Sequence, residues 1–287
     1  VHHVNSSAIR LFHLKDFPEF IYPPAYKKSG ISLGVSLANH EWIVVSDADC
    51  THGAEWLQTI AYAIESSNNL FFTAPILLSD GNHLITKMQQ TENQAFMVVT
   101  AAGIRSALHD IANGANMAFA KSAFINVNGY EGNYHFASGD DMFLIEKMRK
   151  KIGDRIGFVK SIHAAANTVA KENWSSLISQ RIRWAGKNKG LERPVIHIIW
   201  SFIGLYHVLL FIYLCLALCS LTSIWPFLIL FIPKLVIDFV LIKAGADFLN
   251  QKISVFLFIP LQVLYTFYIL YLGIHVMLRK KGDWEEK

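Results

Sequence analysis

Two acidic pairs are the residues of this chain best suited to chemistry. Asp47 and Asp49 stand one residue apart after an apolar run, and Asp140 and Asp141 are adjacent much later in the chain. Two carboxylates separated by one residue can address one bound group together, and oxygen ligands of this kind suit Mg²⁺ or Mn²⁺ shared with substrate phosphates. A further carboxylate can remove the proton of a hydroxyl group as a general base. Together the pairs predict metal-assisted group transfer from a phosphate-bearing substrate.

Each acidic pair also has a purely structural interpretation. Aspartate is common where a strand gives way to a turn, because its side chain hydrogen-bonds nearby backbone groups. Asp140 and Asp141 precede a helical segment that Ser138 could cap, and acids in a first helical turn are favoured by the helix dipole. Either interpretation is open for one short motif taken alone, so other parts of the chain have to decide.

A cationic and aromatic cluster follows near the middle of the chain, formed by Gln180, Arg181, Arg183 and Trp184. Arginine can bind a pyrophosphate bidentately, and the face of a tryptophan can support a sugar or a cation. The alternative is a basic helix beside anionic lipid, where arginine is ordinary. The two acidic pairs and this cluster together favour a substrate with a diphosphate that must leave, such as a sugar nucleotide.

The first acidic pair follows a predicted strand. Residues 42–45 are apolar, largely β-branched and uncharged, which is typical of a strand in a sheet that is covered on both faces. Ligands bind at the carboxyl ends of strands in open α/β sheets. Asp47 and Asp49 therefore fall where a binding site is expected.

The surrounding elements are predicted from hydrophobic periodicity. A strand is expected near residues 8–14, before a proline-rich loop, and Gln89, Gln90 and Glu92 are expected on the solvated face of a helix. Alternation of helices and strands predicts an α/β fold with a largely parallel sheet. Helices are predicted over 28–39, 54–66, 83–107 (interrupted at Gly103) and 174–189, and strands over 70–75, 117–120 and 156–159.

The C-terminal part of the chain holds most of the apolar residues. Residues 195–233 and 253–278 contain no Asp, Glu, Lys or Arg. A spanning helix needs about 20 apolar residues, so these stretches predict about three membrane spans. Lys234 and Asp238 lie between them at i, i+4 spacing, where charge is costly unless the two residues pair against the bundle or mark an interfacial end.

The charge distribution gives an orientation. The net charge of +4 is modest and does not indicate a nucleic-acid partner. By the positive-inside rule, basic residues before the first span place the preceding domain in the cytoplasm. Three full passes would put residues 279–281 outside, against that rule, which a non-spanning or re-entrant segment would resolve. The basic residues before the span are Arg181, Arg183, Lys187, Lys189 and Arg193.

In this order, the features resemble the membrane-anchored inverting glycosyltransferases of family 2, which include cellulose, hyaluronan and chitin synthases. The Asp-Ala-Asp sequence at 47–49 is similar to the DxD motif that holds metal and nucleotide diphosphate in that family. The basic pair at 27–28 precedes it as in many members, which puts Lys28 on the donor side. The resemblance implies Mg²⁺ or Mn²⁺ at Asp47 and Asp49.

The later motifs extend the resemblance to nearly the whole chain. Asp140-Asp141 stands where the family has Glu-Asp, whose second acid is the base, so Asp141 is the expected catalytic residue and Asp140 its rival. Two further segments match the family's donor and acceptor regions. They are the Q-x-x-R-W signature, with Gln180, Arg181, Arg183 and Trp184, and the acceptor-side segment with Asn113, Gly114 and Asn116.

The resemblance implies a GT-A type α/β domain over residues 1–193, a membrane domain of about three transmembrane helices over 194–280, and a polar tail over 281–287. It implies a hexosyltransferase of the cytoplasmic membrane, acting in polysaccharide or cell-envelope synthesis. A sugar would pass from a nucleotide donor, expected to be a UDP-sugar, to a glycan or lipid acceptor with inversion. Partner subunits of a glycan assembly complex are expected if the product is an extruded polymer.

Two alternatives stay open. Family members begin with a strand and an early acid that contact the base and ribose of the donor, and no such segment precedes Val1. We therefore expect an N-terminally incomplete domain, and a catalytically inactive membrane scaffold is the alternative. Within the enzyme class, the alternative to polymer synthesis is transfer of one sugar to a lipid-linked acceptor.

Overall fold

A four-stranded sheet lies at the centre of the N-terminal part of the chain. The computed structural model describes residues 9–187, 194–253 and 255–278. The strands of this sheet lie in the order β1 (Trp42–Ser46), β5 (Asn116–Ala120), β3 (Phe71–Thr73) and β6 (Ile156–Phe158). β5 is antiparallel to both of its neighbours, and only β6 runs parallel to β3. The α/β fold is confirmed, but the sheet is mixed rather than largely parallel.

The mixed topology has a simple cause. β5 comes from a distant part of the chain and inserts between β1 and β3, so Ala118 of β5 is in register with Val44 on one side and Phe72 on the other. β1 is thereby left at the edge of the described sheet, and its residues are half-buried. Both faces of β1 nevertheless pack in the core, with Ile43 and Val45 on one side and Val44 on the other, so the expectation of a strand covered on both faces is confirmed.

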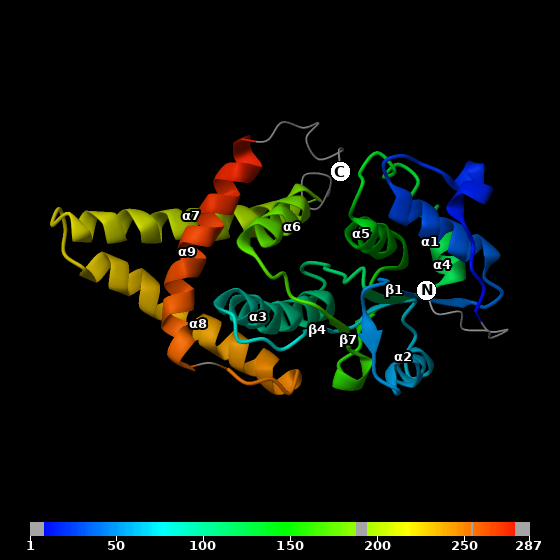
Figure 1. Ribbon diagram of the computed structural model, residues 1–287, viewed down its shortest axis with the longest axis horizontal. Coiled ribbons are helices and arrows are strands. Elements are labelled where there is room, and N and C mark those ends of the chain that lie inside the picture. Colours follow the sequence, from blue (N-terminus) through cyan, green and yellow to red (C-terminus); the bar gives the residue numbers. More distant parts are fainter. Residues whose placement is uncertain (1–8, 188–193, 254, 279–287) are drawn as a thin grey trace.

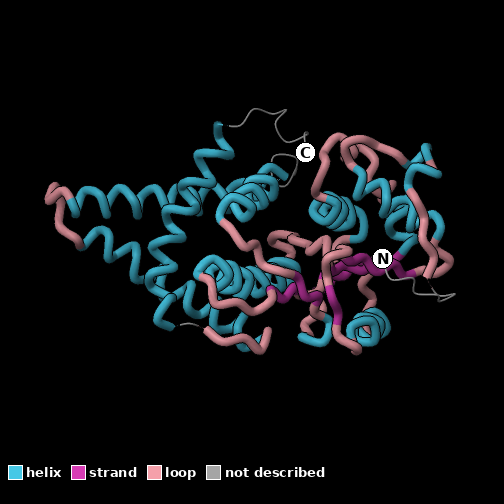
Figure 2. Tube along the Cα trace, in the orientation of Figure 1, coloured by secondary structure: helices cyan, strands magenta, loops and turns pink. Residues whose placement is uncertain are grey.

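A smaller sheet and the helices complete this part of the molecule. β7 (Ala166–Thr168) lies between β2 (Thr51–His52) and β4 (Ile76–Leu78). Figure 2 shows that the strands gather in the N-terminal part, away from the long C-terminal helices. The helices are α1 (Tyr26–Leu37), α2 (Trp56–Glu65), α3 (Leu84–Ser106), α4 (Lys121–Asn126), α5 (Asp140–Ile152) and α6 (Trp174–Lys187), with short turns η1 (Leu14–Asp16), η2 (Pro18–Phe20) and η3 (Ile162–Ala164).

Two local predictions are corrected. Residues 9–13 form no strand, and η1 and η2 follow in the proline-rich segment. Gly103 does not interrupt its helix, because α3 continues to Ser106. A Cβ at Gly103 would lie 2.3 Å from the ring of His109, so this glycine allows the chain to fold back closely against the helix end.

The hydrophobic core covers both faces of the larger sheet. Phe71, Phe119 and Leu144 are fully buried on one face, to which α5 contributes. Neighbouring strand residues point to opposite faces, so Phe72 packs on the other side with Ile60 of α2. This packing fixes β1 relative to α5, and hence places the ends of both elements near each other.

Three long helices follow: α7 (Pro194–Leu218), α8 (Trp225–Phe248) and α9 (Val255–Leu278). In Figure 1, α7 and α8 form a hairpin that extends away from the sheet, and α9 runs across it. α7 and α9 are long and apolar enough to cross a membrane. Of the predicted basic cluster, Lys189 and Arg193 lie outside the described residues, as do residues 279–281.

α8 differs from its two neighbours. It contains Lys234 and Asp238, which form the pair that the sequence left open, with Nζ and Oδ2 2.6 Å apart. Lys234 also donates to Gln262 of α9. The other end of α8 packs directly on α3, where a Cβ at Gly245 would lie 2.0 Å from the backbone oxygen of Gln94. α8 is therefore a packing partner of the α/β part.

Candidate functional site

Lys27 joins the two acidic pairs that the sequence singled out. Its Nζ lies 2.6 Å from Oδ1 of Asp47, which follows β1, and 2.9 Å from Oδ2 of Asp140 in the first turn of α5. Residues from three separate elements, the start of α1, the end of β1 and the start of α5, therefore meet at one cation. The side chain of Asp140 is nearly buried, whereas those of Lys27 and Asp47 are partly exposed.

The carboxylates of this cluster favour the protonated, cationic form of Lys27. Burial lowers the pKa of Lys27, but the charges of Asp140 and Asp47, with their hydrogen bonds, outweigh this effect and raise the pKa above its ordinary value. Lys27 is therefore a cation throughout the physiological pH range. It faces the solvent-exposed side of the cluster, where an anionic ligand could approach.

Gly114 lies between the acids and the lysine. Its N–H donates to Oδ2 of Asp141 at 3.3 Å, and its carbonyl accepts from Nζ of Lys27 at 3.4 Å. A Cβ at this position would lie 2.7 Å from Oδ2 of Asp140. Only glycine allows this close approach without moving the carboxylate.

Asp141 is held at the N-terminus of α5. Its Oδ1 accepts the N–H of Met142 at 2.8 Å, in addition to the bond from Gly114. The expected cap by Ser138 is not formed. The N-cap residue is Gly139, in the left-handed region with φ 89°, and no side chain caps the helix. These two backbone N–H groups thus fix the orientation of the Asp141 carboxylate at the start of α5.

Lys28 has a different environment from its neighbour, which corrects the expectation that it contacts the donor. It is fully buried, and its Nζ donates to the backbone oxygens of Asn133, Phe136 and Ser138 at 2.9, 2.6 and 2.9 Å. Lys28 therefore holds the loop before α5 in place. Lys27 is the member of the pair that faces the acids.

The predicted acceptor segment is mostly structural. Nδ2 of Asn113 donates to the carbonyl of Ala74, and Nδ2 of Asn116 donates to those of Pro75 and Ala164, each at 2.8 Å. Asn116 is fully buried. These amides hold the start of β5 against η3 and the segment between β3 and β4. Gly114 is therefore the residue of this segment that contacts the acid cluster.

The Q-x-x-R-W segment lies on α6, and Arg181 is committed to contacts within the protein. Its Nη2 lies 2.5 Å from Oε2 of Glu92 on α3, and its Nε donates to the hydroxyl of Tyr268 on α9 at 3.2 Å. Burial lowers the pKa of Arg181, but the charges and hydrogen bonds of Glu92 and Tyr268 together outweigh this effect and raise the pKa above its ordinary value. The expectation that Arg181 binds the donor is not supported by this geometry.

The other members of this segment are more accessible. Arg183 is exposed, Gln180 is half-buried, and Trp184 is 43% exposed. Ile196, at the start of α7, packs with Phe143 of α5. The first of the long apolar helices therefore contacts α5 close to the acids at its N-terminus.

Comparison with known proteins identifies the family. The sequence matches the glycosyl transferase family 21 profile over residues 23–284. The chain belongs to glycosyl transferase family 21. The predicted glycosyltransferase with an α/β fold is thereby confirmed, although the motifs resemble family 2 and the profile is that of family 21. A search of curated proteins gave no significant match.

The family 21 chain has a modest set of metal ligands. In the part of the chain that the structure describes, no group of three or more His, Cys, Asp or Glu side chains could hold a metal ion. Mg²⁺ usually needs only one or two carboxylates beside substrate phosphates, and Asp47 and Asp49 supply that number. Asp49 is exposed to solvent, and Asp47 is partly exposed. The pair fits a metal that is held jointly with a diphosphate.

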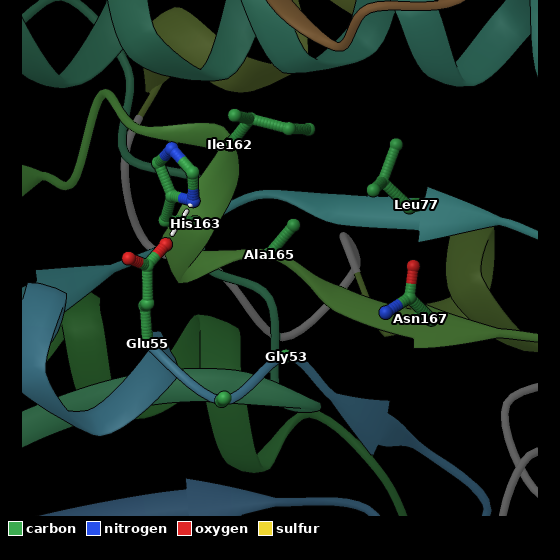
Figure 3. A pocket seen from close by; sticks show the side chains of 8 residues that line it. Gly53, Glu55, Leu77, Ile162, His163, Ala165 and Asn167 are labelled. Atoms are coloured by element: carbon green, nitrogen blue, oxygen red, sulfur yellow. Dashed lines mark ion pairs between the residues drawn. The ribbon is translucent and has the colours of Figure 1, made fainter.

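A hollow of this glycosyltransferase lies on the smaller sheet, apart from the acidic cluster, and is shown in Figure 3. It has a volume of about 230 Å³ and contains none of the sequence-predicted residues. His163 and Glu55 form an ion pair at its edge, with Nδ1 and Oε2 2.6 Å apart, and both side chains are largely exposed. The lining residues are Gly53, Ala54, Glu55, Leu77, Ile162, His163, Ala165 and Asn167.

The sequence did not predict the ion pair of Glu92, and it placed Gln89 and Gln90 on a solvated face. Gln89 and Gln90 are buried rather than solvated, and Glu92 pairs with Arg181. Their polar character hid the fact that α3 is covered by α6, α8 and α9. The only available signal was the regular occurrence of amides, which suit a helix packed against backbone groups, as Gln89 does when it donates to the carbonyl of Lys171 at 2.8 Å.

Proposed function

We propose that this family 21 protein is a membrane-bound, metal-dependent inverting glycosyltransferase. It transfers a sugar from a nucleotide-sugar donor, a UDP-sugar, to a glycan or lipid acceptor. The observation that carries the proposal is the meeting of Asp47 and Asp140 at the Lys27 cation, beside Gly114 and Asp141. A cation that holds two carboxylates can exchange one of them for the diphosphate of a donor.

The donor side consists of Lys27, Asp47 and Asp49. The Lys27 ammonium binds the diphosphate as a point charge. Asp47 and Asp49 would hold Mg²⁺ or Mn²⁺ against the same diphosphate. When bound, that ion neutralises the charge that develops on the leaving nucleoside diphosphate. Asp49, which is exposed, can reach such an ion without breaking a contact of the core.

Asp141 is the general base of the proposed reaction. The acceptor hydroxyl oxygen attacks the anomeric carbon, its proton passes to the Asp141 carboxylate, and the bond to the donor phosphate breaks on the opposite face. One displacement of this kind inverts the anomeric centre. Asp141 is half-buried, whereas Asp140 is almost fully buried and bound to Lys27, which favours Asp141 over its rival.

The membrane assignment rests on α7 and α9. Both helices meet the length and composition for a span, and large apolar side chains such as Ile198, Phe202 and Leu205 are exposed along α7. Arg181 and Arg183 precede α7, so the positive-inside rule places the catalytic part in the cytoplasm. On this arrangement, Arg183 and Trp184 border the acceptor near the bilayer surface.

The experiment is nucleotide release from a panel of UDP- and GDP-sugars, with the protein in detergent, Mn²⁺ or Mg²⁺, and a membrane extract as acceptor. We expect metal-dependent turnover of one donor that is lost in Asp49→Ala and Asp141→Asn. Asp154→Asn is the matched control, because its side chain is 92% exposed and pairs with Arg149 rather than with a residue of the acidic cluster. Donor binding should persist in Asp141→Asn, since that change removes only the base.

Absence of turnover with every donor, by a protein that melts cooperatively, would overturn the proposal and favour an inactive scaffold. Normal transfer by Asp141→Asn would show that the base assignment is wrong. Product length distinguishes the two enzyme classes: a single added sugar indicates a lipid-linked acceptor, and a ladder of products indicates polymer synthesis.

A further inference from the structure

We propose that Glu92 and Tyr268 position the indole of Trp184 through Arg181, and that Arg181 is a positioning residue rather than a ligand of the donor. The inference deepens the proposed function, because it assumes that Trp184 borders the substrates. It assigns a role to two residues that lie outside every motif of the sequence.

The contacts converge from three helices. Glu92 of α3 and Tyr268 of α9 both hold the guanidinium of Arg181 on α6, at 2.5 and 3.2 Å. The Arg181 side chain is 12% exposed and that of Glu92 is 20% exposed. A buried guanidinium needs an anionic partner, because removing one member of such a pair leaves an uncompensated charge. The position of Arg181 is therefore set by α3 and α9 together.

The same guanidinium stacks on the ring of Trp184. The Cζ atom of Arg181 lies 4.3 Å from the ring centroid of Trp184, one helical turn further along α6. This cation–π contact covers part of the ring, while 43% of the residue is exposed. Because Glu92 and Tyr268 fix the guanidinium, they also fix the plane against which the exposed indole stacks.

The geometry separates this role from donor binding. Two of the five N–H groups of Arg181 donate to Tyr268 and Glu92, and the side chain is only 12% exposed, so little of the guanidinium is accessible to a phosphate. An arginine that bound the diphosphate would lower the KM for the donor. A positioning arginine instead acts on the rate of transfer from the bound state, which is measured by kcat.

The kinetic test uses Glu92→Gln, Tyr268→Phe and Arg181→Lys in the detergent-solubilised full chain, with donor saturation curves. We expect kcat to fall about tenfold in Glu92→Gln and Arg181→Lys and less in Tyr268→Phe, with the donor KM within about twofold of the wild type. Asp247→Asn is the matched control, because it removes an exposed ion pair on α8 and should change neither constant. A large rise in donor KM for Arg181→Lys with kcat unchanged would overturn the inference.

A second readout does not depend on activity. Acrylamide quenching of tryptophan fluorescence is measured with and without a Trp184→Phe change, so that the difference reports Trp184 alone. We expect this component to be quenched more strongly in Glu92→Gln than in the wild type or Asp247→Asn. Unchanged quenching would refute the positioning role.

The two readouts keep this inference distinct from the proposed function. If the wild type transfers no sugar from any donor, the proposed function fails, and the quenching of Trp184 still decides whether Glu92 positions it. Tyr268→Phe keeps the shape of the side chain and removes only the hydroxyl. If Glu92→Gln does not melt cooperatively, Tyr268→Phe replaces it in both readouts. We then expect a smaller fall in kcat and a smaller increase in the quenching of Trp184.

Discussion

Replacement of Gly245 by alanine should separate α8 from α3. A Cβ at Gly245 would lie 2.0 Å from the backbone oxygen of Gln94 and 2.5 Å from its carbonyl carbon. Both obstacles are helix backbone, so no change of side-chain rotamer can relieve the contact. An increase from 2.0 Å to the ordinary 3.4 Å requires the two helices to move apart by about 1.4 Å at this point.

The energy of this change follows from the cost of overpacking. Insertion of an extra carbon into a well-packed interface costs typically about 1–3 kcal/mol, and a backbone obstacle places Gly245→Ala at the upper end. For a protein of this size, a loss of about 3 kcal/mol lowers Tm by roughly 6–12 °C. Gly204 of α7 supplies the control, because no atom lies within 4 Å of its Cβ position. Gly204→Ala should leave Tm unchanged or raise it, since alanine favours a helix by about 1 kcal/mol.

The assay is thermal unfolding in detergent, followed by far-ultraviolet circular dichroism, for the wild type and both variants. The separation of α3 from α8 also bears on the site, because Glu92 lies two residues before Gln94 on α3. We therefore expect Gly245→Ala to lower transfer activity as well. Equal melting temperatures for Gly245→Ala and Gly204→Ala would refute the close contact of α3 with α8.

The remaining predictions concern the adjacent lysines and one histidine. Lys28→Met leaves three backbone oxygens without their donor, and we expect it to lower Tm by roughly 6–12 °C, from a loss of about 3 kcal/mol. Lys27→Met removes the cation that would meet the diphosphate, so it should weaken donor binding in equilibrium titration more than Lys28→Met does; the opposite order would contradict the assignment of the two lysines. Burial lowers the pKa of His52 below its ordinary value of 6.5, so the unfolded chain binds more protons as the pH falls below 6.5 and stability falls with it. The drop in Tm between pH 7.5 and about 5.5 should be smaller in His52→Gln than in the wild type, and an equal drop would exclude this histidine as its source.

Local pattern was sufficient for much of the fold. The spans of α1, α2, α3 and α5 follow from helical periodicity, and the apolar run at 42–45 became β1 with the two aspartates at its end. These elements depend on neighbouring residues, which a single sequence contains. The acidic pairs, the cationic segment and the apolar C-terminal stretches were likewise visible without a structure, and they led to a glycosyltransferase.

The sequence could not assign roles within the candidate site. Lys27 and Lys28 are adjacent, but successive residues of a helix point about 100° apart, so one reaches the acids and the other the core. Which lysine takes which position depends on where α5 lies. Arg181 is similar: Glu92 and Tyr268 stand 89 and 87 residues away from it, and nothing in local pattern relates them.

The order of the strands and the surroundings of α8 were also decided only by tertiary structure. Alternation of helices and strands is compatible with a parallel or a mixed sheet, and the insertion of β5 between β1 and β3 is a long-range pairing. Hydropathy alone made α8 resemble a membrane span, although its charged residues set it apart. Sequence determines which elements form, because their periodicity is local, whereas side chains acquire their partners only when distant elements pack together.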